Sequence, residues 1–150
     1  MSLLRAIGGG VAGAAAVTLL NEGGRRVIPH APRMDVIGMR GVRRPMEAMG
    51  YDPPRGRTLR KVSLGGDVLS NGLYYGLVAA GDGRHVWRRG IALGLLAGLG
   101  AALLPPVIGL GNQPHRRTPW TQLLTVAWYT LAGVAAAGAA KAVEELNVEW

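Results

Sequence analysis

The sequence predicts an all-α integral membrane protein, a four-helix transmembrane bundle with a long basic cytoplasmic loop. Three observations support this fold class. Four apolar stretches approach or exceed the roughly 20 residues needed to cross a bilayer. Glycine is abundant, with 24 among 150 residues, as in helices that pack closely in lipid. The 17 Lys and Arg, against 9 Asp and Glu, lie mostly between the apolar stretches, as in membrane proteins that follow the positive-inside rule.

The four predicted transmembrane helices belong to one domain, residues 1–150, and cover residues 3–20, 63–80, 90–110 and 119–143. The first is short and rich in glycine. We expect it to be retained rather than cleaved as a signal peptide, because its basic region carries only Arg5. The second contains Asp67 among its apolar residues, so a re-entrant or interfacial segment is the alternative there.

Residues at the ends of these stretches predict where the helices begin and end. Ser63 can cap the second helix. Pro105 and Pro106 are expected to kink or end the third helix, because the second ring removes a hydrogen-bond donor and clashes with the preceding turn. Thr118 followed by Pro119 predicts an N-cap and a first helical position for the fourth helix.

The long loop, residues 21–62, holds ten Lys and Arg against four acidic residues. Its centre, residues 33–49, mixes methionine and other apolar residues with arginine, which predicts a short amphipathic helix lying on the membrane surface. An irregular basic loop is the alternative, because Gly38, Gly41 and Pro45 disfavour a helix.

The distribution of charge predicts the orientation of the chain in the membrane. The long loop and the loop after the third helix together carry twelve Lys and Arg, and the opposite side carries five. The positive-inside rule therefore places the long loop in the cytoplasm and both termini outside. This layout resembles that of small inner-membrane proteins of bacteria, which implies an inner (plasma) membrane location; no functional residue transfers from the resemblance.

Small residues recur at a spacing of four in the predicted helices, which lets helices approach closely through dispersion and backbone contacts. Packing within one bundle is the first interpretation, and contact with a second subunit is the other. The predicted helix-packing glycines are Gly72, Gly76, Gly90, Gly94 and Gly98.

Polar side chains at helical spacing predict an intramembrane polar cluster formed by the second and fourth helices. Its predicted members are Asp67, Ser70, Asn71, Tyr74, Gln122, Thr125 and Tyr129. A carboxylate within a membrane-spanning helix could bind a cation, relay a proton or hold a polar headgroup. A purely structural network is the interpretation that we favour, because Asp67 lies only about 6 Å into its helix.

Basic clusters in the loops predict contact with anionic lipid headgroups. The predicted lipid-binding residues are Arg25, Arg26, Arg43, Arg44, Arg60, Lys61, Arg116 and Arg117. The arginines could serve topology alone, which is the simpler interpretation. A bound phospholipid is the one ligand that we expect, and no other cofactor is predicted.

Catalytic and metal-binding patterns are missing from the sequence. There is no cysteine, the three histidines lie in predicted loops, and no hydrolase, zinc-protease or nucleotide-binding motif occurs. We therefore expect no catalytic residue, no metal site and no nucleic-acid partner. The resulting hypothesis is a non-catalytic membrane subunit, which packs in a larger assembly or homo-oligomer and contacts anionic lipid.

Two alternatives belong to other functional classes. The first is a small transporter or channel for an ion, a proton or a solute, with Asp67 at its site. The second is a lipid-modifying enzyme that uses Asp67, Glu22 and the loop histidines as acid–base groups. It is the weaker alternative, because these candidates are scattered along the sequence.

Overall fold

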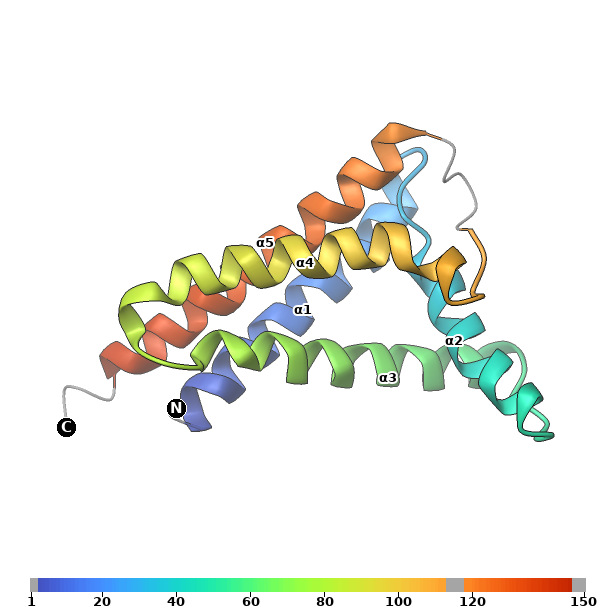
Figure 1. The fold of residues 1–150 in the computed structure, drawn as a ribbon, viewed down its shortest axis with the longest axis horizontal. Coiled ribbons are helices and arrows are strands. Elements are labelled where there is room, and N and C mark those ends of the chain that lie inside the picture. The colour runs from blue at the N-terminus through green and yellow to red at the C-terminus, as the bar shows by residue number, and fades with distance from the viewer. Residues whose placement is uncertain (1–2, 113–117, 147–150) are drawn as a thin grey trace.

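The computed structural model describes residues 3–112 and 118–146 of the chain. These residues form five α-helices and no strand, which confirms the all-α prediction (Figure 1). The helices are α1 (Leu3–Val27), α2 (Met34–Ala48), α3 (Gly56–Gly76), α4 (Val86–Val107) and α5 (Pro119–Leu146). Two short 3-10 helices, η1 (Leu77–Ala79) and η2 (Gly83–His85), connect α3 to α4.

Three of the helices are long and apolar enough to cross a membrane. They are α1, α4 together with η2, and α5, so three of the predicted transmembrane helices are supported by their length and composition. The predicted second helix, α3, is not among them. Four charged residues lie along its length: Arg57, Arg60, Lys61 and Asp67.

The two largest differences from the predicted helix boundaries are seven residues each, and the other boundaries differ by up to four residues. The first helix continues beyond Leu20 to Val27, because Glu22 forms ion pairs with arginines three and four residues later, which support the added turns. The second helix begins at Gly56 rather than at Ser63. Ser63 is therefore a buried residue within α3 and not its cap; the extended conformation of Arg55 ends the preceding loop instead.

Proline acts at the other boundaries as predicted. Pro105 and Pro106 lie in the last turn of α4, and the helix ends at Val107. The amide of Leu110 donates to the carbonyl of Pro105 at 2.7 Å and closes this end. The last helix begins at Pro119, where a missing amide hydrogen costs nothing.

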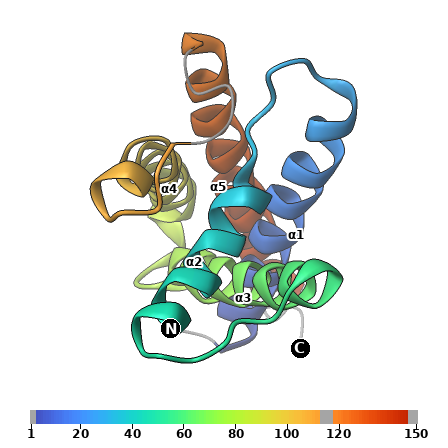
Figure 2. The ribbon, with the colours of Figure 1, turned by 90° about the vertical axis from the view of Figure 1, so that its right-hand side faces the viewer.

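The basic segment that was expected to hold an amphipathic piece forms the helix α2, so an irregular loop is not what the structure contains. Asp35 lies in its first turn, where a negative charge is favoured by the helix dipole. Pro45 lies in its last turns, close to where the helix ends at Ala48. The helix packs on α3, and in Figure 2 it lies in front of the space between the four long helices α1, α3, α4 and α5.

The four long helices pack in the order α4, α5, α1, α3. The N-terminal end of α1, the η1–η2 connection and the C-terminal end of α5 lie at one end of the molecule (Figure 1). The opposite end holds α2, the C-terminal end of α4 and the N-terminal end of α5. This second end is called the α2 end below.

Glycines set the closest helix contacts. Gly94 and Gly98 face α5, and a Cβ on them would lie 2.6 Å from the Cα of Thr130 and 2.7 Å from the Cα of Val126. Gly90 meets the backbone of Gly133 in the same interface. All three predicted helix-packing glycines of α4 therefore lie in the contact between α4 and α5, within one chain.

The contact between α1 and α3 also rests on glycine. A Cβ on Gly76 would lie 3.2 Å from the carbonyl oxygen of Ala6, and Gly10 meets the carbonyl of Gly72. The predicted helix-packing glycines of α3, Gly72 and Gly76, thus lie against α1. These glycines therefore pack helices against each other within the chain.

The interior consists mainly of small side chains, such as Ala132 and Ala136 of α5, around the fully buried Tyr75. Large apolar side chains lie outside instead: Leu19 is 72% exposed, Leu73 70% and Leu96 64%. A protein in water would rarely leave so much contiguous apolar surface exposed. The distribution fits helices whose outer faces meet lipid.

Candidate functional site

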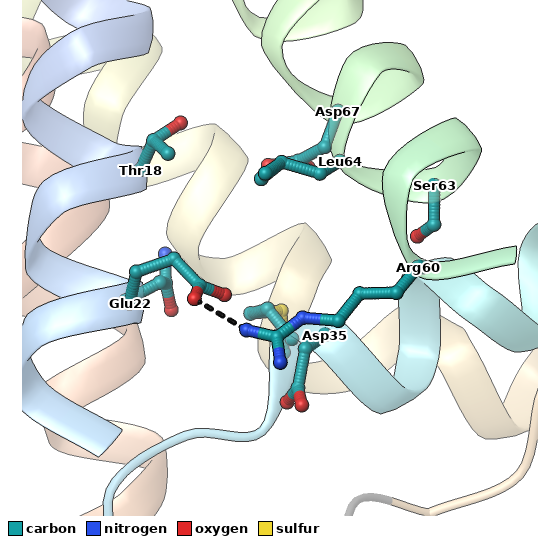
Figure 3. A pocket seen from close by; sticks show the side chains of 10 residues that line it. Thr18, Glu22, Asp35, Arg60, Ser63, Leu64 and Asp67 are labelled. Atoms are coloured by element: carbon teal, nitrogen blue, oxygen red, sulfur yellow. Dashed lines mark hydrogen bonds and ion pairs between the residues drawn. The ribbon is translucent and has the colours of Figure 1, made fainter. Parts of the chain in front are cut away.

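A small cavity of about 30 Å³ lies between α1, α2 and α3 at the α2 end (Figure 3). That volume accommodates about one water molecule or one small ion. The cavity is lined by Thr18, Asn21 and Glu22 of α1, by Met34, Asp35 and Gly38 of α2, and by Arg60, Ser63, Leu64 and Asp67 of α3. Three carboxylates therefore border this cavity, whereas the predicted polar cluster contained one carboxylate, that of Asp67.

Glu22 is held by arginines from two helices. Its Oε2 accepts from Nη2 of Arg25 at 2.6 Å and from Nη2 of Arg60 at 2.8 Å. Arg26 adds a longer ion pair at 3.8 Å. A carboxylate bound in this way stays ionised and links α1 to α3, so it is poorly suited to act as a general base.

Asp35 is the corresponding anion of α2. Its two oxygens accept from Nε and Nη2 of Arg33 at 2.9 and 3.0 Å, and Arg25 lies 3.9 Å away. Burial raises the pKa of Asp35, but the hydrogen bond and positive charge of Arg33, with the charge of Arg25, outweigh it and hold the pKa below its ordinary value. Arg25 thereby connects the anions of α1 and α2.

Asp67 differs from the other two carboxylates. Within residues 3–112 and 118–146 it forms no ion pair. It also lines a second cavity of about 230 Å³, which lies between α2, α3, α4 and α5 and includes Tyr129 and Pro105. Asp67 is thus the one residue with a negative charge that borders both spaces.

The seven residues of the predicted polar cluster separate into different environments. Asp67 and Tyr129 line the second cavity together. Asn71 is buried, and its Nδ2 donates to the carbonyl of Asp67 at 2.9 Å within α3. The hydroxyl of Tyr74 donates to the carbonyl of Leu93 at 2.9 Å and bridges α3 to α4.

The remaining members lie away from the cavities. Ser70 is exposed, and its hydroxyl donates to the carbonyl of Asp67 at 3.1 Å. Thr125 is buried, but it donates to the carbonyl of Thr121 within α5 at 2.8 Å. Gln122 is partly buried on the same helix and lines neither cavity. Helical spacing alone therefore did not select the residues that share a space.

The predicted lipid-binding residues also separate. Arg25 and Arg60 are committed to Glu22 in the ion pairs described above. Arg116 and Arg117 lie outside the described residues. The other four predicted residues are exposed at the α2 end. The exposed set, called the basic surface below, consists of Arg26, Arg43, Arg44 and Lys61.

Several residues that position this end were not found from the sequence. Arg40 of α2 donates through Nη1 to the carbonyls of Leu110 and Asn112 at 3.1 and 2.8 Å. Thr121 of α5 donates to the carbonyl of His30 at 2.7 Å. No local sequence pattern predicts contacts between residues so far apart along the chain.

No protein-family model, curated protein or solved structure matches this chain. Its function must therefore be argued from its own geometry. Among the described residues, no group of three or more His, Cys, Asp or Glu is arranged to hold a metal ion. What the α2 end offers chemically is a small oxygen-lined space, an ionic network around it and a basic surface outside.

Proposed function

We propose that the protein is a non-catalytic integral membrane subunit, which packs in a larger membrane assembly or homo-oligomer and contacts anionic lipid through the basic surface. The observation that carries this proposal is the division of the molecular surface. Large apolar side chains are exposed along the long helices, and exposed arginine and lysine gather at the α2 end.

The charge of the basic surface is available to a partner because the carboxylates nearby are already engaged. Glu22 and Asp35 are occupied by Arg25, Arg33 and Arg60. Arg43 has an exposed partner in Glu47 at 3.5 Å, and such a pair contributes little in water. Each basic residue next to an anionic membrane contributes about 1 kcal/mol to its attraction.

The same reasoning supports an orientation in the membrane. The α2 end carries the two loops with most of the Lys and Arg, so we place it in the cytoplasm and both termini outside, in the inner membrane of a bacterium. In this orientation α3 lies beside α1 as a fourth membrane helix. Its charged first turns, from Arg57 to Lys61, would then lie at the headgroup level.

Lipid contact is tested in nanodiscs that contain brominated phosphatidylglycerol or brominated phosphatidylcholine, with quenching of tryptophan as the signal. Trp120, at the start of α5, reports on the α2 end. The double variant Arg43→Gln and Arg44→Gln should lower the preference for phosphatidylglycerol by about thirtyfold, from about 1 kcal/mol per charge. The control Arg84→Gln and Arg88→Gln makes the same charge change at the opposite end, where both residues are exposed.

Equal loss in both double variants would show that net charge and not this surface attracts the lipid. The subunit part of the proposal has a separate test, native mass spectrometry of the protein extracted gently from its own membranes. Co-migrating polypeptides or copies at a fixed ratio support it. A monomer that carries only lipid contradicts it.

A second candidate function is transport of an ion, a proton or a solute, and the position of Asp67 favours it. This carboxylate borders one cavity toward α1 and another toward α4 and α5, which is the arrangement expected of a site between two access routes. Flux into liposomes that is lost in Asp67→Asn, and kept in Asp82→Asn at the opposite end, would support it. Absence of flux for protons and for every monovalent ion tested would refute ion transport through Asp67.

A further inference from the structure

The cavity between α1, α2 and α3 contains polar atoms that have no partner. Both Oγ1 of Thr18 and Oδ1 of Asn21 are buried and form no hydrogen bond. Asn21 is only 9% exposed, and the two residues lie one turn apart on the same face of α1. Buried polar groups in folded proteins nearly always have a partner, so two such oxygens in one cavity require an explanation.

The orientation of the Asn21 amide is fixed by its neighbour. Its Nδ2 donates to the carbonyl of Val17 at 2.9 Å, and a flipped amide would place two acceptor oxygens against each other. Oδ1 is therefore the unpartnered atom, and it can only accept a hydrogen bond or bind a cation. Figure 3 shows Thr18 pointing from α1 and Asp67 from α3 into the same space.

The charges around the cavity leave one carboxylate without a counter-charge. Glu22 is paired with Arg25 and Arg60, and Asp35 with Arg33. The guanidinium of Arg60 also lines the cavity, but its Nη2 is directed at Glu22 (Figure 3). A monovalent cation would neutralise the charge of Asp67, whereas a divalent cation would leave an excess of positive charge.

The groups that lack a hydrogen-bond partner are a hydroxyl and an amide oxygen, and the group that lacks a counter-charge is a carboxylate; all three are hard oxygen ligands. The thioether of Met34 is the one sulfur that lines this cavity, and no imidazole lines it. Soft metals are therefore disfavoured. The absence of a convergent group of three acidic or histidine residues in the described part of the chain disfavours a divalent ion. The volume of about 30 Å³ fits one small ion.

We propose that this cavity is a binding site for a monovalent cation of the size of sodium, held by oxygens of Asp67, Thr18 and Asn21. The cation supplies the partner that Oγ1 and Oδ1 lack and the charge that Asp67 lacks. It also ties α1 to α3 near the ion pair of Glu22 with Arg60, which joins the same helices. The proposal deepens the second candidate function and rests on the same residue, but binding does not require transport.

The test measures thermal unfolding of the full chain in phosphatidylcholine nanodiscs, with sodium chloride exchanged for choline chloride at constant ionic strength. Sodium should raise the melting temperature of the wild type along a saturating curve, as a ligand of the folded state does. Choline should not. Potassium is run in parallel, and a smaller effect is expected because the cavity is small.

Two variants connect the response to the site. Asp67→Asn removes the charge and should abolish the sodium response; Thr18→Val keeps the shape, removes one oxygen and should weaken the sodium affinity by about tenfold or more, as loss of a supporting group does at other ion sites. Asp82→Asn is the matched control, because it removes an exposed carboxylate at the opposite end, and it should respond as the wild type.

An equal melting temperature in sodium and choline overturns the proposal, since water alone then fills the cavity. A sodium response retained in Asp67→Asn overturns it as well. If that variant does not fold, Thr18→Val and calorimetric titration of the wild type with sodium chloride decide the matter. Binding without flux in liposomes would keep this site and refute transport, whereas flux without binding would refute the site and leave transport in place.

Discussion

Replacing Gly94 by alanine tests whether the contact between α4 and α5 holds the molecule together. A Cβ at this position would lie 2.6 Å from the Cα of Thr130 and 2.7 Å from the carbonyl oxygen of Tyr129, against at least 3.4 Å for an ordinary contact. The deficit is 3.4 minus 2.6, or 0.8 Å. Both neighbouring atoms belong to the backbone of α5, so neither can move aside alone, and the two helices must separate.

Overpacking of this kind costs about 1–3 kcal/mol. Alanine offsets part of that cost, because it favours a helix over glycine by about 1 kcal/mol. The net loss expected for Gly94→Ala is therefore up to about 2 kcal/mol. Leucine at the same position should prevent α4 from docking on α5 altogether.

The assay is reversible unfolding in mixed micelles of increasing denaturing detergent, followed by circular dichroism. Gly65→Ala is the matched control, because nothing lies within 4 Å of a Cβ at that position in α3. It should gain up to about 1 kcal/mol from helix propensity alone. A Gly94→Ala protein as stable as Gly65→Ala would refute the reasoning that α4 and α5 are held by glycine contacts.

Three further predictions concern the α2 end. Glu22→Gln should lower the free energy of unfolding by about 1–2 kcal/mol in the same assay, because arginines of α1 and α3 lose their anion; the exposed Glu47→Gln should change it by less than about 0.5 kcal/mol. The lowered pKa of Asp35 predicts a contribution to stability that is complete at neutral pH and is lost below about pH 4, as the pH falls through the folded-state pKa; an Asp35→Asn protein whose acid profile matches the wild type would contradict this. Arg40→Ala should speed amide hydrogen exchange at residues 108–112 by several-fold, because two carbonyls there lose their donor; unchanged exchange would show that the connection is held by other contacts.

The parts of the fold that the sequence could predict are those with local signals. Pro119 begins α5 and the pair Pro105–Pro106 ends α4, because proline acts on its own turn. Apolar runs identify α1, α4 and α5, because the length and hydropathy of a run are also local properties of the sequence. The start of α3 was wrong, because Ser63 has the chemistry of a cap but lies in a stretch that continues as a helix from Gly56.

The candidate site was predicted only in part, because its partners come from three helices. Asp67 was found as a carboxylate in an apolar context. Ser70 was placed with it by spacing, yet Ser70 is exposed and lines neither cavity. The link from Arg60 to Glu22 could not be foreseen, since nothing in the sequence says how α1 and α3 lie against each other.

Two kinds of contact that respond to different conditions hold the helices together. Between α4 and α5 and between α1 and α3, glycine allows backbone contact, which dissolved ions do not weaken. At the α2 end, the pair of Arg25 with Asp35 joins α1 to α2 and the pair of Arg60 with Glu22 joins α1 to α3, and salt screens such pairs where they reach water. Rising ionic strength would therefore loosen α2 and its neighbours first, while the glycine-packed remainder stays intact, so the chain has a built-in order of melting.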